Sequence, residues 1–211
     1  MAEGHKWYAA IYDRVMAPDE GGILREIRTH VVGGARGRIL EVGVGTGANF
    51  PYYKQTNANA IVGTEPDPFM LERARRKLQE LALSIDLHQA PAEKLPFEDS
   101  SFDTVITTFV LCTVEDLQRS LREIRRVLKP SGQFRFYEHV RSVHPLAALI
   151  QDVATPVWHW FGAGCHPNRD IGAAIERAGF HLAELRRLRP IPLPPPFCIT
   201  SPRILGVAHP A

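Results

Sequence analysis

The feature that most constrains the fold is an apolar stretch that runs directly into three closely spaced glycines. Residues 38–42, Arg-Ile-Leu-Glu-Val, have the composition of a buried strand, and Gly43, Gly45 and Gly47 follow at once. Because glycine has no Cβ, such a turn lets the backbone approach a ligand more closely than any side chain would permit. A strand, a glycine turn and a helix in this order predict a ligand site at the edge of a parallel sheet.

An acid at the end of the next predicted strand, residues 60–65, narrows the kind of ligand. Glu65 lies 18 residues after Gly47, a spacing at which a carboxylate accepts hydrogen bonds from both hydroxyls of a ribose. The glycines do not follow the dinucleotide spacing G-x-G-x-x-G, and Glu41 precedes the first of them by two residues. A pyrophosphate prefers bare amides and a positive helix end, so this acid disfavours it. We therefore expect a nucleoside-containing cofactor without a phosphate.

The pattern E-x-G-x-G-x-G over residues 41–47 resembles motif I of the class I S-adenosylmethionine-dependent methyltransferases. Residues 90–97 (Ala-Pro-Ala-Glu-Lys-Leu-Pro-Phe), with Ser-Phe-Asp at 101–103, and residues 125–132 (Arg-Arg-Val-Leu-Lys-Pro-Ser-Gly) resemble later motifs of that family. The resemblance covers residues 36–140 strongly and the rest loosely. It implies S-adenosylmethionine as cofactor, whose cationic amino group and sulfonium suit an acid beside the turn.

The resemblance also implies a set of binding residues. Glu41 would face the methionine amino group, Glu65 would bind the ribose, and Phe109 would line the methyl-transfer pocket. Ala92 and Glu93 would lie along the adenine. The remaining cofactor contacts that we expect are Gly43, Gly45, Gly47, Asn49 and Pro66.

Strands and helices alternate along the chain, which predicts an α/β protein with a parallel sheet covered on both faces. By resemblance this is a Rossmann-like, mostly parallel seven-stranded sheet of order 3-2-1-4-5-7-6, with strand 7 antiparallel. The expected strands are 38–42, 60–65, 85–89, 102–111, 133–140, 180–188 and 203–209, and the expected helices span 5–32 (broken near 17–22), 68 onward, 115–128, 144–161 and 168–178. We expect one domain over 1–211, made of an N-terminal helical lid (1–32), a cofactor-binding core (36–140), and substrate-side helices with the last strand pair (141–211).

A narrower similarity concerns the methyl acceptor. Residues 47–53, 110–114, 138–140 and 164–169 resemble the methyltransferase-like group of thiol S-methyltransferases, which implies a small thiol as acceptor. Bacterial phospholipid and quinone methyltransferases share the glycine loop, so amine and phenol acceptors remain alternatives. A cofactor-binding regulatory protein without turnover is the non-enzymatic alternative.

Two residues are candidates for the chemistry of transfer. His139 ends the fifth predicted strand, where it could take a proton from a thiol or act as a structural group. Tyr12 shares a helix face with Tyr8 and would be either a lid residue over the cofactor or part of a core aromatic pair. Enzymes that methylate nucleic-acid amines carry an acid or amide, two prolines and an aromatic after the fourth strand. Here the corresponding residues 107–110 are Thr-Thr-Phe-Val, which include neither the acid or amide nor the prolines.

Composition limits the remaining function classes. The chain of 211 residues has 25 basic and 23 acidic residues and a net charge of +2, which gives no general attraction to nucleic acid. No apolar run approaches the roughly 20 residues that span a bilayer, and residues 1–15 are polar and aromatic, unlike the membrane anchor of the animal thiol methyltransferases. We expect a cytoplasmic protein, with peripheral membrane contact and oligomeric state left open.

The cysteines predict neither disulfides nor a metal site. Cys112, Cys165 and Cys198 show no C-x-x-C spacing, and with His159 and His166 they lack the spacing of metal ligands. We expect reduced thiols, with Cys112 and Cys165 as small apolar fillers, and no metal.

Overall fold

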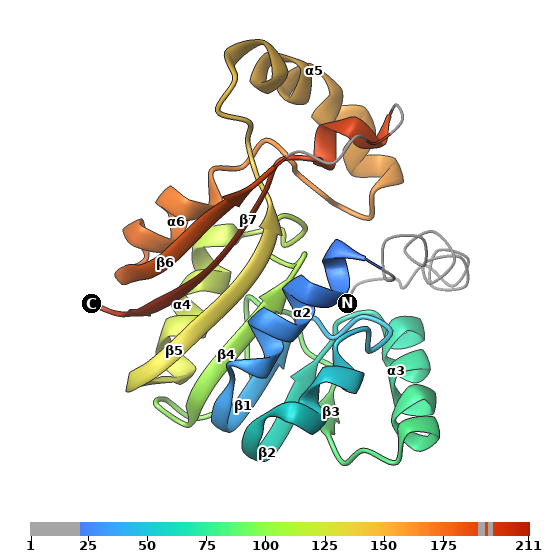
Figure 1. Cartoon of the computed structure of the whole chain (residues 1–211), viewed down its shortest axis with the longest axis vertical. Helices are drawn as coiled ribbons and strands as arrows, with labels where there is room; N and C mark the ends of the chain where they lie inside the picture. Colours follow the sequence, from blue (N-terminus) through green and yellow to red (C-terminus); the bar gives the residue numbers. More distant parts are fainter. Residues whose placement is uncertain (1–21, 190–192, 194–195) are drawn as a thin grey trace.

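The structure is a computed structural model that describes residues 22–189, 193 and 196–211. Its centre is a seven-stranded sheet of order β3-β2-β1-β4-β5-β7-β6 (Figure 1). The strands are β1 (Arg36–Val42), β2 (Asn57–Thr64), β3 (Asp86–His88), β4 (Phe102–Thr108), β5 (Leu128–His139), β6 (Phe180–Leu188) and β7 (Arg203–Pro210). The helices are α2 (Ile23–Gly33), α3 (Pro68–Leu81), α4 (Leu117–Val127), α5 (Pro145–Phe161) and α6 (Ile171–Arg177), with short 3-10 turns η2 (Phe50–Gln55) and η3 (Phe197–Thr200).

Strand directions confirm the expected topology. β1 pairs in parallel with β2 and β4, and β4 pairs in parallel with β5. β7 is antiparallel to both β5 and β6. The carboxyl ends of β1, β2, β4 and β5 therefore meet at one edge, which is where open α/β sheets bind ligands.

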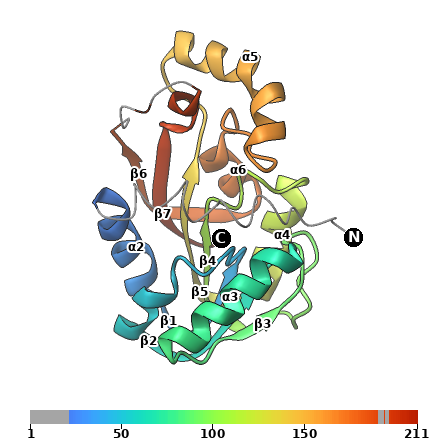
Figure 2. The same cartoon turned by 90° about the vertical axis from the view of Figure 1, so that its right-hand side faces the viewer.

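Helices cover both faces of the sheet (Figure 2). On one face α2 and α3 bury apolar side chains such as Leu24, Val31 and Ala74. On the other, α4 and α6 bury side chains such as Leu121 and Ile175. Each helix thus buries one apolar stripe against the sheet, as an amphipathic helix of an α/β protein does.

The fourth strand is shorter than the sequence predicts. It was expected to reach Leu111, but it ends at Thr108 because Phe109 adopts a left-handed backbone with φ of 58°. The chain then closes a turn in which the amides of Thr113 and Val114 donate to the carbonyl of Val110. Phe109 and Cys112 consequently lie in a loop beyond the strand.

Other boundaries differ by a few residues, and side-chain caps explain two of them. Asp116 and Asp170 accept hydrogen bonds from backbone amides and start α4 and α6, two and three residues later than expected.

Of the predicted 5–32 helical segment, the structure describes α2. Residues 1–21, including Tyr8 and Tyr12, lie outside the described residues.

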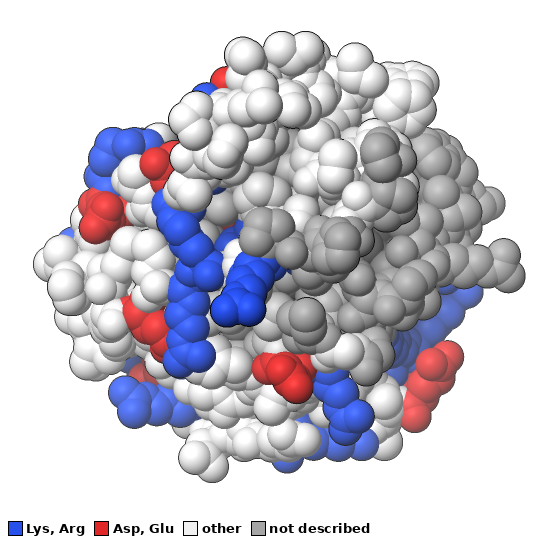
Figure 3. Space-filling model, turned by 45° about the horizontal axis from the view of Figure 1, so that its top comes forward, with Lys and Arg blue, Asp and Glu red and all other residues white. Residues whose placement is uncertain are grey.

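Helix α5 lies beyond the end of β5, clear of the sheet (Figure 1). Its outward side chains are apolar, and Figure 3 shows few charged side chains over this end of the molecule. The exposed residues are Leu146, Leu149, Ile150, Val153, Val157, Trp160 and Phe161. We call this set the α5 apolar face. Among the described residues, no helix has the length and hydrophobicity to cross a membrane.

Candidate active site

The glycine turn after β1 has the geometry expected of a ligand loop. Gly43, Gly45 and Gly47 all have positive φ, of 71°, 56° and 83°. A Cβ at Gly43 would lie 2.5 Å from a methyl of Val110, and one at Gly47 would lie 2.3 Å from the ring of Phe50. A Cβ at Gly45 would meet nothing within 4 Å. The outer glycines are thus required by packing, whereas Gly45 leaves open space in which a ligand can approach the backbone.

Glu65 is held directly against this open position. The side chain is 7% exposed; one carboxylate oxygen accepts from the amide of Gly45 at 2.9 Å and the other from the amide of Asp67 at 3.0 Å. Burial raises the pKa of Glu65 to about 7, although both amide hydrogen bonds oppose the shift. The acid and the glycine turn, 20 residues apart in the chain, therefore form one unit.

Glu41 lies in a buried polar network. Its carboxylate accepts from the amide of Asn49 at 2.8 Å and from the hydroxyl of Tyr53 at 2.7 Å. Asn49 also donates to Thr108 at 3.0 Å and accepts from Arg28 at 2.6 Å. Burial raises the pKa of Glu41 to about 7. The network joins β1, the glycine turn and the end of β4, and Glu41 is 1% exposed, so its contact with a methionine amino group stays a prediction.

The segment expected along the adenine has a structural role of its own. A carboxylate oxygen of Glu93 accepts from the amides of Glu115 at 2.9 Å and Asp116 at 3.3 Å, so it holds this segment to the start of α4. Ala92 is buried in the core, and the carbonyl of Pro66 accepts from Gln89 at 3.1 Å. The adenine contacts of Ala92 and Glu93 stay predictions.

On the acceptor side, His139 faces two cysteines. Its ring stacks on Phe109 with centroids 4.3 Å apart, and its Nδ1 lies 3.6 Å from Sγ of Cys112 and 3.7 Å from Sγ of Cys165. Both cysteines are buried. Cys112 and Cys165 are buried, as expected of small fillers, and in addition they form one cluster with His139.

Sequence reasoning missed this cluster because its members are 26 and 27 residues apart on three segments. Motif spacing detects ligands on one loop or helix only. The available signal was that Cys112 follows β4 and His139 ends β5, and that these two strands are neighbours in the sheet.

The residues at this edge fit a cationic nucleoside cofactor. Gly45 leaves the space that a Cβ would fill, and two buried acids, Glu41 and Glu65, stand at the ends of adjacent strands. Carboxylates suit ribose hydroxyls and positive charge, and would repel a pyrophosphate.

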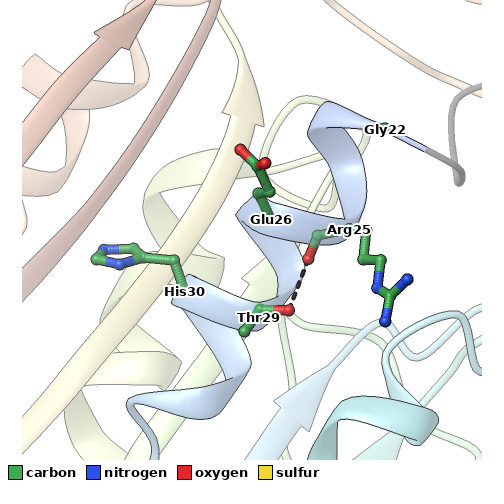
Figure 4. A pocket seen from close by; sticks show the side chains of 5 residues that line it. All are labelled: Gly22, Arg25, Glu26, Thr29 and His30. Carbon is green, nitrogen blue, oxygen red and sulfur yellow. Dashed lines mark hydrogen bonds between the residues drawn. The ribbon is translucent and has the colours of Figure 1, made fainter.

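A hollow lies over α2 and is lined by Gly22, Arg25, Glu26, Thr29 and His30 (Figure 4). Thr29 donates to the carbonyl of Arg25 at 2.8 Å, the bond dashed in the figure. None of these residues belongs to the glycine turn or the acceptor-side cluster, and we assign the hollow no role.

Comparisons with known proteins agree with this geometry. Residues 40–136 match the family model described as a methyltransferase domain. The chain is 31% identical over 210 residues to thiol S-methyltransferase TMT1A of Homo sapiens, covering 95% of this chain and 82% of that protein. It is 37% identical over 158 residues to a phosphatidylethanolamine N-methyltransferase of Cereibacter sphaeroides, covering 71% and 76%. Among solved structures, a putative methyltransferase from Bacillus halodurans superposes with a TM-score of 0.72 at 17% identity, covering 90% of this chain and 100% of that one.

Proposed function

This chain belongs to the class I S-adenosylmethionine-dependent methyltransferases, and we propose that its methyl acceptor is a small thiol. S-adenosylmethionine is its cofactor, which when bound supplies an electrophilic methyl group on a sulfonium. One observation carries the thiol assignment: the similarity to a thiol S-methyltransferase extends over 95% of the chain and therefore includes acceptor-side residues after 140.

The chain's own residues have three tasks in this reaction. Glu65 and the Gly45 backbone bind and orient the cofactor, which converts a two-body encounter into an aligned displacement. Phe109 covers the methyl-transfer pocket and excludes water from it. His139, at the end of β5, receives the proton of the incoming thiol; since a free thiol has a pKa near 8.5, only a modest shift is needed.

The test is a methyl-transfer assay with purified protein, S-adenosylmethionine and a panel of small thiols, amines, phenols and phospholipid headgroups, with S-adenosylhomocysteine release as readout. We expect turnover on thiols. Turnover on amines or phenols alone would contradict the thiol assignment and leave the family membership intact. Tight cofactor binding with no transfer to any compound would favour the regulatory alternative.

A second candidate acceptor, the amine headgroup of a phospholipid, is favoured by the α5 apolar face. Trp160 is 79% exposed and Val153 73% exposed on a helix beyond the carboxyl edge of the sheet. Exposed aromatic and aliphatic side chains on one helix face suit the interfacial region of a membrane. The similarity to a phosphatidylethanolamine N-methyltransferase is consistent with this reading.

Vesicles of phosphatidylethanolamine and phosphatidylcholine distinguish the two candidates. A lipid acceptor predicts cosedimentation with vesicles and methylation of their headgroups, both reduced in Trp160→Glu. Gln79→Glu, which adds the same charge on exposed α3, is the matched control. Unchanged binding in Trp160→Glu, or no binding at all, would exclude this candidate.

A further inference from the structure

Three segments that are distant in sequence converge beyond the carboxyl ends of β4 and β5. Cys112 lies in the turn after β4, His139 ends β5, and Cys165 lies in the loop between α5 and α6. The amide of His166 donates to the carbonyl of Cys112 at 2.6 Å, which ties the two cysteine loops together. The buried carboxylate of Glu138 accepts from the amide of Cys112 at 3.3 Å. These backbone hydrogen bonds hold the cluster in place, in addition to the contacts of His139 with the two sulfurs.

The distances within the cluster match those of a metal site. Nδ1 of His139 lies 3.6 Å and 3.7 Å from the two sulfurs, and all three ligand atoms lie within 4.8 Å of one another. Tetrahedral zinc, with Zn–S of about 2.3 Å and Zn–N of about 2.0–2.1 Å, places a sulfur and a nitrogen ligand about 3.6 Å apart. Nδ1 of His139 therefore already lies at the spacing of zinc ligands from both sulfurs.

The composition of the cluster points to a soft or borderline cation and to an incomplete coordination shell. Two thiolates and one imidazole suit Zn²⁺. Within the described part of the chain, no fourth histidine, cysteine or acid joins the group. Structural zinc sites have four protein ligands, whereas sites with three keep one position for a reactant.

The position of the cluster in the fold indicates which reactant would bind at the open coordination position. His139 stacks on Phe109, the residue that follows β4 at the edge where the cofactor binds. The cysteines are buried, but His139 is only half-buried, which leaves a route from solvent to the open position. A thiol is a strong ligand for zinc, and an amine or phenol is a weaker match to a sulfur-rich site.

We propose that Cys112, His139 and Cys165 bind Zn²⁺, and that the open fourth position binds the acceptor thiol as a thiolate. This inference rests on the proposed thiol acceptor, and it replaces the sequence-based expectation that the chain binds no metal. It also changes the role of His139 from proton acceptor to metal ligand.

The step balances without an oxidant or reductant. On metal binding, Cys112 and Cys165 each release a proton to solvent. The substrate thiol releases its proton to solvent as it binds zinc and displaces water. Its sulfur electron pair then forms the new S–CH₃ bond, while the pair of the broken C–S⁺ bond stays on the cofactor's sulfur. The neutral thioether binds zinc weakly and leaves.

Metal content is the first test. Protein purified under reducing conditions without chelator is expected to contain one zinc per chain by mass spectrometry of the metal. Cys112→Ser and Cys165→Ser should each bind zinc more than about 10-fold more weakly, since even residues outside the coordination shell alter affinity by roughly 10–100-fold. Cys198→Ser is the matched control, because Cys198 is exposed and outside the cluster. Calorimetry with S-adenosylmethionine verifies that each variant is folded.

The open position is tested with Co²⁺ in place of zinc and without S-adenosylmethionine. The visible spectrum should show tetrahedral cobalt with thiolate ligands and should shift when a small thiol is added, but not with an equal concentration of an amine. A thiol that leaves the spectrum unchanged would overturn the substrate assignment.

Two further results separate this inference from the proposed function. Thiol methylation that persists at full rate in metal-free protein, or a Cys112–Cys165 disulfide in place of metal, would overturn the zinc site and leave the thiol acceptor standing. Zinc-loaded protein that methylates only amines would contradict the proposed function, and with it the thiolate at the fourth position.

Discussion

At the scale of single residues, we expect the cofactor site to depend on one glycine and one acid that the fold brings together. Gly45 exposes its backbone to open space, and Glu65 accepts a hydrogen bond from its amide. The two neighbouring glycines serve packing, since a Cβ at either would collide with Val110 or Phe50. Packing and ligand access thus belong to different glycines of the same short motif.

We expect Glu65→Ala to weaken S-adenosylmethionine binding by about 1–3 kcal/mol, because the ribose hydroxyls and the amides of Gly45 and Asp67 lose their acceptor. Isothermal titration calorimetry measures the change. Glu72→Ala is the control, since Glu72 is exposed on α3. An unchanged affinity would rule out the ribose assignment.

The two buried acids also predict a pH dependence. Burial raises the pKa of Glu41 and of Glu65 from 4.5 to about 7. The folded state therefore binds protons more tightly than the unfolded state between pH 4.5 and 7, so the contribution of these groups to stability falls as pH rises through that window. A cationic cofactor favours the ionised carboxylates instead, and its affinity should rise between pH 6 and 8.

Calorimetry in two buffers of different ionisation enthalpy measures this effect as proton release on cofactor binding. In Glu65→Gln, which cannot ionise, the release should shrink. Affinity that is flat from pH 6 to 8 with no proton release would contradict the assignment of these acids to the cofactor site.

At the scale of elements, one side chain fastens α5 to the rest of the fold. The amide nitrogen of Gln151 donates to the carbonyls of Val140, Pro167 and Ile199 at 2.8–3.1 Å, and its oxygen accepts from the amide of Ser142 at 2.7 Å. Gln151 is 2% exposed. Because most other large side chains of α5 face solvent, polar contacts such as these and the ion pair of Asp152 with Arg141 contribute more than an apolar core to the helix position.

We expect Gln151→Ala to destabilise the fold by about 1–3 kcal/mol, since it leaves buried carbonyls without donors. Urea unfolding measures the loss, and hydrogen exchange should show reduced protection in α5 and η3 first. Gln79→Ala, on the exposed surface of α3, is the control. Equal stability of both variants would mean that α5 is held by other contacts.

At the scale of the whole molecule, the strand order brings the cofactor and acceptor sites to one edge. The order β2-β1-β4-β5 places Glu65, the glycine turn, Phe109 and His139 at successive strand ends. A ligand bound there contacts segments from much of the chain, so binding should stabilise the molecule as a unit.

We therefore expect S-adenosylmethionine at about 100 times its dissociation constant to stabilise the folded state by about 2.7 kcal/mol. Differential scanning fluorimetry measures this as a rise in Tm. Glu65→Ala at the same cofactor concentration should show a smaller rise. A Tm independent of the cofactor would contradict binding to the folded state.

Sequence alone determined the fold class and the cofactor, and it predicted the residues of the cofactor site. Alternating strands and helices, three glycines after residue 42 and an acid at residue 65 are local patterns, and local backbone and side-chain physics is enough to interpret them. Strand order and the antiparallel last strand followed from resemblance and are confirmed. The end of β4 was misplaced because an apolar run continues past Phe109, where the backbone turns left-handed.

Only the tertiary structure decided what lies on the acceptor side. Cys112, His139 and Cys165 have no spacing that marks them as a group, and the packing of two loops against the end of β5 brings them within 4.8 Å. The partners of Glu41 are closer in sequence, since Asn49 and Tyr53 lie 8 and 12 residues further along the chain. Their hydrogen bonds to its carboxylate are also visible only in the structure. Contacts between distant segments depend on how the whole sheet closes, and a one-dimensional pattern does not encode that closure.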